Sequence, residues 1–237
     1  MESLPKVVII DLGSQYTFVI ERTLRELGVR SAIFNDPTKA SSWFKQHPCS
    51  AVIFSGGDRS VYDEGSPRPP LAALELDVPV LPICYGMHWI AHHFGGKVER
   101  TGSEYGKGQI VCEESSLFSG MAGPLQVCNS HGDSVTRVPD GYRVIARSTN
   151  GGIAAIENAE RIVFCVQFHP EVVDTPRGKD LLSNFLFRIA GCERDWRATS
   201  IIADTRENLR ASIKSGERAI MGYSGGVDSS VGAAIAA

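Results

Sequence analysis

The sequence lacks the features that would place the protein in a membrane or nucleic-acid-binding class. No apolar run approaches the length needed to cross a membrane, and the opening "MESLPKVVIIDLG" has too short an apolar run for a signal peptide. Acidic and basic residues nearly cancel, with a net charge of −3, so a broad basic surface is not expected. The sequence contains no internal repeat and no low-complexity tract. We therefore expect a soluble, cytoplasmic, globular protein that binds neither membranes nor nucleic acid.

Paired cysteines are also missing. The six cysteines are scattered and form no Cys-x-x-Cys motif, which indicates reduced thiols rather than a disulfide framework. Most of them are expected to be inert packing residues, such as Cys165 in the apolar segment "RIVFCVQF". Cys84 differs, because it stands between the apolar run 78–83 and a segment, 87–94, that is typical of a helix.

What the sequence does contain is an alternation of short apolar segments and helix-like segments. "KVVIIDLG", "VRSAIF", "CSAVIFSGG" and "VPVLPI" predict buried strands. "SQYTFVIERTLRELG" predicts a helix, with Phe18, Ile20, Leu24 and Leu27 near helical spacing. The alternation predicts an α/β fold, a mainly parallel sheet flanked by helices. Functional loops gather at the carboxyl ends of such strands, so residues 11–13, 55–57 and 84–86 should meet there.

The second half of the chain has a different sequence pattern. From about residue 97 to 166, short strands punctuated by Gly, Asn and Pro predict an antiparallel appendage that returns to the main sheet, and "GKDLLSNFLFRIAGC" predicts a closing helix. A helix "TSIIADTRENLRASIKSG", a strand and loop "RAIMGYSGG" and a helix "VDSSVGAAIAA" follow. We therefore expect a first domain at 5–192, a linker at 193–200, and at 201–237 the start of a second α/β domain whose remaining strands are missing.

Cys84 lies where a strand is expected to turn sharply into a helix. Such a corner lifts a nucleophile above the sheet, the helix N-terminus favours a thiolate, and Gly86 leaves room for the turn. "VQFHPEV" supplies a base: Pro170 favours an extended backbone at His169, so Glu171, two residues on, can hold the histidine ring. These residues predict a nucleophile, a base and an orienting carboxylate. The alternative is a packing cysteine with an unrelated loop histidine.

"ICYGM" and "FHPE" resemble motifs of the class I (triad) glutamine amidotransferases. "IDLGSQYT", "SGGDRSVYDEGSP", "SHGDSV" and "SGGVDSS" narrow the resemblance to the fused, glutamine-hydrolysing GMP synthases, from about Lys6 to the last residue. The resemblance implies a flavodoxin-like α/β fold and hydrolysis of glutamine to glutamate and ammonia through a γ-glutamyl thioester, with no cofactor. It implies that Cys84, His169 and Glu171 form a catalytic triad. It also implies that the backbone N–H groups of Gly57 and Tyr85 form the oxyanion hole.

The same resemblance implies further contacts with glutamine. In the family, the main chain of the segment "NSHGDSV" helps to hold the amino-acid end of the substrate. For the side chains of this segment a polar hairpin turn, with Asp133 bonding its own backbone, stays an open alternative. The implied glutamine contacts are Gly56, Gly86, His88, Ser130, His131, Gly132 and Asp133.

"SGGVDSS" resembles the pyrophosphate-binding loop of the N-type ATP pyrophosphatases, and it lacks the lysine of a Walker A loop. Backbone N–H groups and hydroxyls at a helix start can form a nest for an anion; a Ser/Gly-rich helix cap is the alternative. The resemblance implies that the full-length enzyme adenylates XMP with ATP and Mg²⁺, that ammonia then displaces AMP to give GMP, and that this enzyme is a homodimer. The implied ATP-binding residues are Ser224, Gly225, Gly226, Val227, Asp228, Ser229 and Ser230.

Three positions depart from the usual family pattern. His88 stands in place of a glutamine, Asp58 in place of a common proline, and "VCNSHGD", which includes Cys128, where an aromatic residue commonly precedes "SHGD". We expect these changes to affect glutamine binding more than the chemistry. His88 and His92 have the i, i+4 spacing of metal ligands, but no third ligand adjoins them, so no metal is expected.

Two rival functions fit the sequence less well. A glutaminase subunit of another synthetase, of the anthranilate or carbamoyl-phosphate type, is disfavoured by "GSQYT" and "SGGVDSS". A non-catalytic glutamine-sensing or scaffold module is disfavoured by the intact triad. The resemblance therefore implies a glutaminase that supplies ammonia for the ATP-dependent amination of XMP to GMP.

Overall fold

The computed structural model describes residues 6–213, 217–218 and 220–236. The chain divides into two compact units between Arg194 and Asp195, inside the segment expected to be a linker. Each unit is considered by itself below.

The first unit is built on one sheet, and within the described residues this sheet has nine strands in the order β2-β1-β3-β4-β9-β8-β7-β5-β6. The strands from β2 to β9 in this order are parallel, and the others are antiparallel. The parallel strands are β1 (Val7–Ile10), β2 (Ser31–Phe34), β3 (Ala51–Phe54), β4 (Val80–Pro82) and β9 (Val163–Val166). The antiparallel strands are β5 (Lys97–Cys112), β6 (Pro124–Arg137), β7 (Arg143–Ser148) and β8 (Ile153–Asn158).

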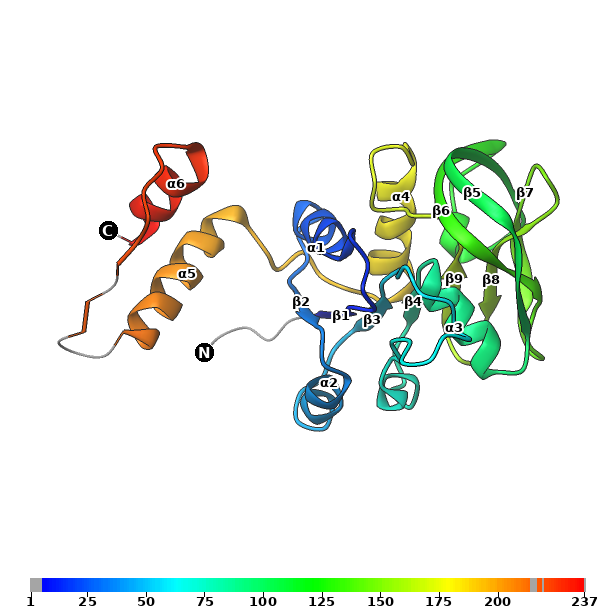
Figure 1. Cartoon of the computed structure of the whole chain (residues 1–237), viewed down its shortest axis with the longest axis horizontal. Helices are drawn as coiled ribbons and strands as arrows, with labels where there is room; N and C mark the ends of the chain where they lie inside the picture. The colour runs from blue at the N-terminus through cyan, green and yellow to red at the C-terminus, as the bar shows by residue number, and fades with distance from the viewer. Residues whose placement is uncertain (1–5, 214–216, 219, 237) are drawn as a thin grey trace. The chain divides into compact units, whose positions relative to one another are not determined.

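Helices cover both faces of the parallel strands (Figure 1). Because side chains alternate along a strand, Val7 and Ile9 lie in one core with α1 and α4, whereas Val8 and Ile10 lie in another with α2 and α3. Burial on both faces explains why these strands read as continuous apolar runs, and it confirms the predicted α/β fold. The helices are α1 (Thr17–Glu26), α2 (Pro37–Phe44), α3 (Tyr85–His93) and α4 (Gly178–Ser183), which continues as a π-helical stretch, Asn184–Ile189; 3₁₀ turns span Leu71–Leu74 and Ser116–Phe118.

Of the four apolar residues noted at near-helical spacing in the α1 segment, Phe18 does not share the buried face. Ile20 and Leu24 are buried and Leu27 packs against the same core, but the Phe18 side chain is 74% exposed. Phe18 and Ile20 are two residues apart, which is about 200° around an α-helix, so they cannot both face the sheet.

The predicted antiparallel appendage is confirmed, and β8 returns it to the main sheet by pairing with β9. The hairpin turn that was left open as an alternative at "SHGD" is absent, because this segment lies inside the continuous strand β6. His131 pairs with Glu104 and Asp133 pairs with Arg100 across the ladder. The irregularity lies instead in β5, where a register shift between Arg100 and Glu104 absorbs the extra residues.

In the second unit, the two predicted helices are present as α5 (Ala198–Ser212) and α6 (Val227–Ala236). The strand expected in "RAIMGYSGG" is not: the residues described from Ile220 to Ser224 have no regular secondary structure. A strand needs a neighbour to pair its backbone groups, and the described residues of this unit contain no strand. In neither unit do the described residues include a helix with both the length and the apolar character needed to cross a membrane.

Candidate active site

The expected sharp corner at Cys84 is present between β4 and α3. Cys84 has φ +50° and ψ −107°, a backbone conformation that residues other than glycine rarely adopt. It is also the N-cap of α3. Two backbone hydrogen bonds hold the corner: Cys84 N–H donates to Val166 O at 2.8 Å, and Gly86 N–H to Ile83 O at 2.8 Å. The strained residue is therefore held by the sheet on one side and by the first helical turn on the other.

A buried histidine and carboxylate stand beside this corner. His169 Nδ1 lies 2.8 Å from Glu171 Oε1, and the Glu171 side chain has no exposed surface. The backbone of His169 is fixed as well, because its N–H donates to Cys128 O at 2.9 Å and its carbonyl accepts from Thr175 Oγ1 at 2.6 Å. The histidine ring is thus held from its side chain and from its main chain.

The pKa of His169 is set by opposing effects. Burial by itself lowers this pKa, but hydrogen bonding and charge from Cys84 and Glu171 outweigh it and raise the pKa to about 10. A ring that keeps its proton at neutral pH can stabilise a thiolate at Cys84 and can then deliver the proton to a leaving group.

The two backbone donors expected to form the oxyanion hole are not used by the protein itself. Within the part of the chain that the structure describes, the N–H groups of Gly57 and Tyr85 donate to no protein acceptor. Gly57 is held so close to Leu12 O that a Cβ atom would lie 2.5 Å from it, so a larger residue would displace this loop. Gly56 and Gly86 pack against the His169 ring and the Phe54 backbone respectively.

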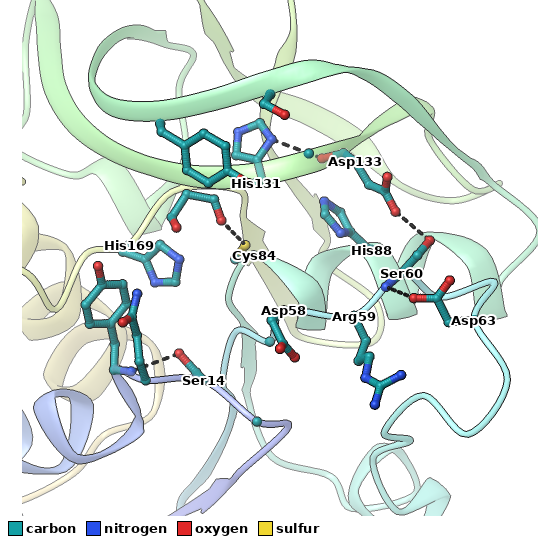
Figure 2. Close-up of a pocket in the computed structure, with 18 of the residues that line it drawn as sticks. Ser14, Asp58, Arg59, Ser60, Asp63, Cys84, His88, His131, Asp133 and His169 are labelled. Atoms are coloured by element: carbon teal, nitrogen blue, oxygen red, sulfur yellow. Dashed lines mark hydrogen bonds between the residues drawn. The ribbon is translucent and has the colours of Figure 1, made fainter.

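A pocket of about 750 Å³ opens above Cys84 (Figure 2), a size typical of small-molecule sites. As predicted, the loops after β1, β3 and β4 meet there, and β5, β6 and the segment after β9 complete the wall. Of the residues expected to contact glutamine, five line the pocket and two, Gly56 and Gly86, do not. The five are His88, Ser130, His131, Gly132 and Asp133.

The side chains of "SHGD" make cross-strand and cross-loop contacts rather than a local turn. Asp133 Oδ2 accepts a hydrogen bond from Ser60 Oγ at 2.6 Å, so this carboxylate does not bond its own backbone as the hairpin alternative supposed. His131 Nδ1 lies 3.0 Å from Asp133 O and must donate to it. The Ser130 carbonyl oxygen accepts a hydrogen bond from the Cys84 thiol, with Sγ 3.7 Å away.

His88 reaches the site from α3 and is buried. Burial is the main cause that lowers the pKa of His88 to about 4, so the ring is neutral at physiological pH. Its Nε2 lies 2.8 Å from Gln167 Oε1, and Gln167 Nε2 lies 3.8 Å from Cys84 Sγ. His92 is exposed and packs against Tyr62, with ring centroids 5.1 Å apart, and the described residues hold no cluster of three metal-binding side chains.

Sequence reasoning missed Gln167, although its position carries a signal. Gln167 stands two residues before His169, the spacing at which side chains of an extended segment point to the same side, and Gln167 Nε2 lies 3.8 Å from Cys84 Sγ. The lining contributed by "GSQYT" was also missed; the ring of Tyr16 packs edge-on against His169 with centroids 4.9 Å apart. Besides Ser14, Gln15 and Tyr16 of this segment, the lining residues that were not predicted are Arg59, Ser60, Asp63, Arg100, Ser103 and Tyr105.

The segment expected to bind pyrophosphate lies in the second unit, at the N-terminus of α6. Its hydroxyls bond locally: Ser224 Oγ lies 3.1 Å from Ser229 Oγ, and Ser230 Oγ donates to Gly226 O at 2.9 Å. Residues 224–228 are exposed. The structure therefore presents this loop as a helix cap with accessible donors.

Comparison with known proteins agrees with this geometry. The chain is 42% identical over 236 residues to the GMP synthase [glutamine-hydrolyzing] of Brachyspira hyodysenteriae, with 98% of this chain and 45% of that protein covered. It is 43% identical over 231 residues to the protein of the same name from Thermobifida fusca, with 97% and 43% covered. The chain therefore spans less than half the length of these relatives.

Solved structures give the same fold. A putative GMP synthase subunit from Thermoplasma acidophilum matches with a TM-score of 0.67 at 27% identity, over 89% of this chain and all of that one. A glutamine amidotransferase from Thermotoga maritima matches in fold, with a TM-score of 0.62 at 19% identity, over 79% of this chain and 99% of that one. The family model "Glutamine amidotransferase class-I" matches residues 8–189. The chain belongs to the class-I glutamine amidotransferase family.

Proposed function

We propose that this chain hydrolyses glutamine to glutamate and ammonia, with Cys84, His169 and Glu171 as a catalytic triad. The observation that carries the proposal is the strained corner that places the Cys84 thiol at the base of an open pocket, next to a histidine whose other ring nitrogen binds a buried carboxylate. Family membership supports the reaction class.

The reaction would proceed in two halves. The Cys84 thiolate attacks the carboxamide carbon of glutamine, and the N–H groups of Gly57 and Tyr85 stabilise the oxyanion that forms. His169 gives its proton to the amide nitrogen, the C–N bond breaks, and ammonia departs. A γ-glutamyl thioester remains on Cys84. A water molecule then gives a proton to His169 and attacks the thioester, which releases glutamate and restores the thiolate. Glu171 keeps the His169 ring in the orientation that both steps need.

The amino-acid end of glutamine would lie against β6. Ser130, His131, Gly132 and Asp133 line the wall of the pocket next to Cys84, and their main chain can bind the substrate there. His88 lines the same pocket. Since its Nε2 is already bonded to Gln167, only the rest of the ring is available to glutamine.

We further propose that the ammonia is used for the amination of XMP to GMP by a synthetase domain. The relatives named GMP synthase [glutamine-hydrolyzing] are more than twice as long as their matched part, which leaves room in them for that domain. The N–H groups and hydroxyls of residues 224–230 suit a pyrophosphate, and the exposed carboxylate of Asp228 is an oxygen ligand of the kind that Mg²⁺ prefers. ATP and Mg²⁺ would serve that second reaction, in a cytoplasmic, homodimeric enzyme.

Substitution and labelling of Cys84 test the glutaminase proposal. Cys84→Ala is expected to abolish release of glutamate from glutamine, because no other group can form the thioester, and to leave the fold intact by circular dichroism. A chloroketone analogue of glutamine should label Cys84 alone, as read by peptide mass spectrometry. Cys49→Ala, which changes a half-buried cysteine outside the pocket, is the matched control and should keep full activity.

Labelling of Cys128 or Cys165, or activity that survives in Cys84→Ala, would contradict the assignment. A folded wild-type chain without glutaminase activity, alone or mixed with an intact synthetase domain, would favour a non-catalytic role. Production of GMP from XMP in that mixture, with glutamine as the nitrogen source, tests the second proposal separately.

A further inference from the structure

We propose that Gln167 stabilises the Cys84 thiolate, and that His88 is a positioning residue that holds the Gln167 amide with its NH₂ group toward the sulfur. The proposal deepens the function above and rests on Cys84 being the nucleophile. It concerns a side chain that neither the triad nor the oxyanion hole includes.

The backbone places Gln167 beside the nucleophile. Ile83 and Val166 form a parallel bridge, and Cys84 N–H donates to Val166 O at 2.8 Å. Cys84 and Gln167 therefore follow directly after two residues that are paired side by side. Gln167 is itself fixed by its N–H, which donates to Ala154 O at 2.8 Å. Its side chain is buried and extends to Cys84 Sγ.

His88 decides which end of the Gln167 amide faces the sulfur. The neutral imidazole carries one N–H, and Nε2 lies 2.8 Å from Gln167 Oε1, an atom that can only accept. Nε2 must therefore be the protonated nitrogen of His88. With the amide oxygen bound there, the amide nitrogen is the end that lies 3.8 Å from Cys84 Sγ.

The hydrogen bonds around the sulfur differ between its two protonation states. A thiol donates, and the Ser130 carbonyl is its acceptor at 3.7 Å. A thiolate can only accept, and the side-chain donors beside it are the Gln167 amide and the His169 ring. Because a hydrogen bond to the charged form favours that form, Gln167 shifts the sulfur toward the thiolate and away from Ser130.

Other titratable groups near the sulfur are left unchanged by substitutions at positions 167 and 88. They come from every element that surrounds the pocket: the loop before α1, the loop after β3, strands β5 and β6, and the segment after β9. They are Tyr16, Asp58, Arg59, Asp63, Arg100, Tyr105, His131, Asp133, His169 and Glu171. A change in the pH profile of Cys84 alkylation between variants therefore reports the altered amide or imidazole.

The experiment measures how fast iodoacetamide alkylates Cys84 as a function of pH, by peptide mass spectrometry on the full chain. Gln167→Met keeps the side-chain bulk but removes the donor, so at pH 6 alkylation of Cys84 is expected to be about tenfold slower than in wild type, with equal rates at high pH. His88→Phe should slow alkylation in the same direction by a smaller factor, since the amide is then free to turn. His88→Gln, which can donate to Gln167 Oε1, should restore the wild-type profile.

His92→Phe is the matched control, because His92 is exposed on the same helix and does not line the pocket. A wild-type profile in Gln167→Met would overturn the role of Gln167, and equal effects of His88→Phe and His88→Gln would overturn the role of His88. If Gln167→Met fails to fold, the two His88 variants decide. The alkylation needs no glutamine, so shifted profiles in a chain without glutaminase activity would leave this inference standing and remove only the proposed function.

Discussion

At the scale of single residues, the pKa of His169 depends on a carboxylate that does not line the pocket. Glu171 is fully buried behind the ring, with Oε1 on His169 Nδ1, and its Oε2 has no hydrogen-bond partner among the described residues. Burying a charge without complete hydrogen bonding costs stability, so the pairing with His169 is what makes this position tolerable. The same pairing helps to raise the pKa of His169 to about 10.

Glu171→Gln should therefore change how stability depends on pH. The folded protein keeps the His169 proton up to about pH 10, whereas the unfolded chain releases it near pH 6.5. This contribution to the free energy of unfolding is complete below about pH 6.5 and is lost as the pH rises toward 10. Removing the carboxylate lowers the pKa of His169, so the decline over this range should be shallower in the variant.

Urea unfolding between pH 6 and pH 10 measures that decline. Glu160→Gln, in an exposed turn, is the control and should keep the wild-type slope. The same slope in wild type and Glu171→Gln would contradict the assignment of the raised pKa. In the glutaminase assay Glu171→Gln should lose about two to four orders of magnitude in kcat, because the orienting group of the base is weakened.

At the scale of elements, the segment between β9 and α4 holds the base and its carboxylate. It is tied to β6 through Thr175, whose Oγ1 donates to His169 O and accepts from Cys128 N–H. It closes on itself where Gly178 begins α4: a Cβ atom at Gly178 would lie 1.8 Å from Pro170 O. The position of His169 thus depends on a glycine nine residues further along the chain.

Gly178→Ala should displace this segment. Because the clash is with backbone and cannot be relieved by a side-chain rotation, we expect a loss of about 1–3 kcal/mol in the free energy of unfolding, together with a lower kcat and slower alkylation of Cys84. Urea unfolding and the alkylation assay measure the two effects. Gly222→Ala, at an exposed position with no atom within 4 Å of the added Cβ, is the matched control. A Gly178→Ala protein with wild-type stability would show that the segment can shift freely.

At the scale of the whole molecule, the two proposed chemistries belong to different units. Every residue that lines the pocket at Cys84 lies before Arg194, and the loop 224–230 lies after it. The first unit has two extensive cores, one on each face of the sheet. The second is described as two helices with an exposed connection, in which the side chain of Ile220 is 98% exposed.

This difference predicts that the 237-residue chain responds to glutamine analogues but not to Mg-ATP. The loop 224–230 has no described strand to hold its donors in place, so Mg-ATP at millimolar concentration should leave the melting temperature unchanged. A ligand at a hundred times its Kd would stabilise the fold by about 2.7 kcal/mol. A thermal-shift titration with Mg-ATP, with Asp228→Ala as the control, decides the matter: a saturable rise in wild type alone would show a working nucleotide site.

Much of this architecture could be predicted from residue patterns, because it depends on local spacing. Continuous apolar runs predicted strands buried on both faces, and the Cys-Tyr-Gly corner and His-Pro-Glu segment predicted neighbours that the structure does bring together. Phe18 shows the limit of such patterns, since it is one of four apolar residues near helical spacing and yet its side chain is exposed. The strand expected near Ile220 failed for another reason: strand formation depends on a partner that local sequence does not reveal.

The sequence by itself determined the fold class, the buried parallel strands and the chemical character of the corner at Cys84, because these follow from periodicity and from residue type. Only the tertiary structure decided that "SHGD" is part of a strand, that Asp133 binds Ser60, and that Gln167 joins His88 to the sulfur. Those contacts join residues 73 to 83 positions apart. The Gln167 contact with Cys84 follows from the pairing of the chain after β4 with the end of β9, and the Asp133 contact joins β6 to the loop after β3. Such pairing is a property of two segments together rather than of either one alone.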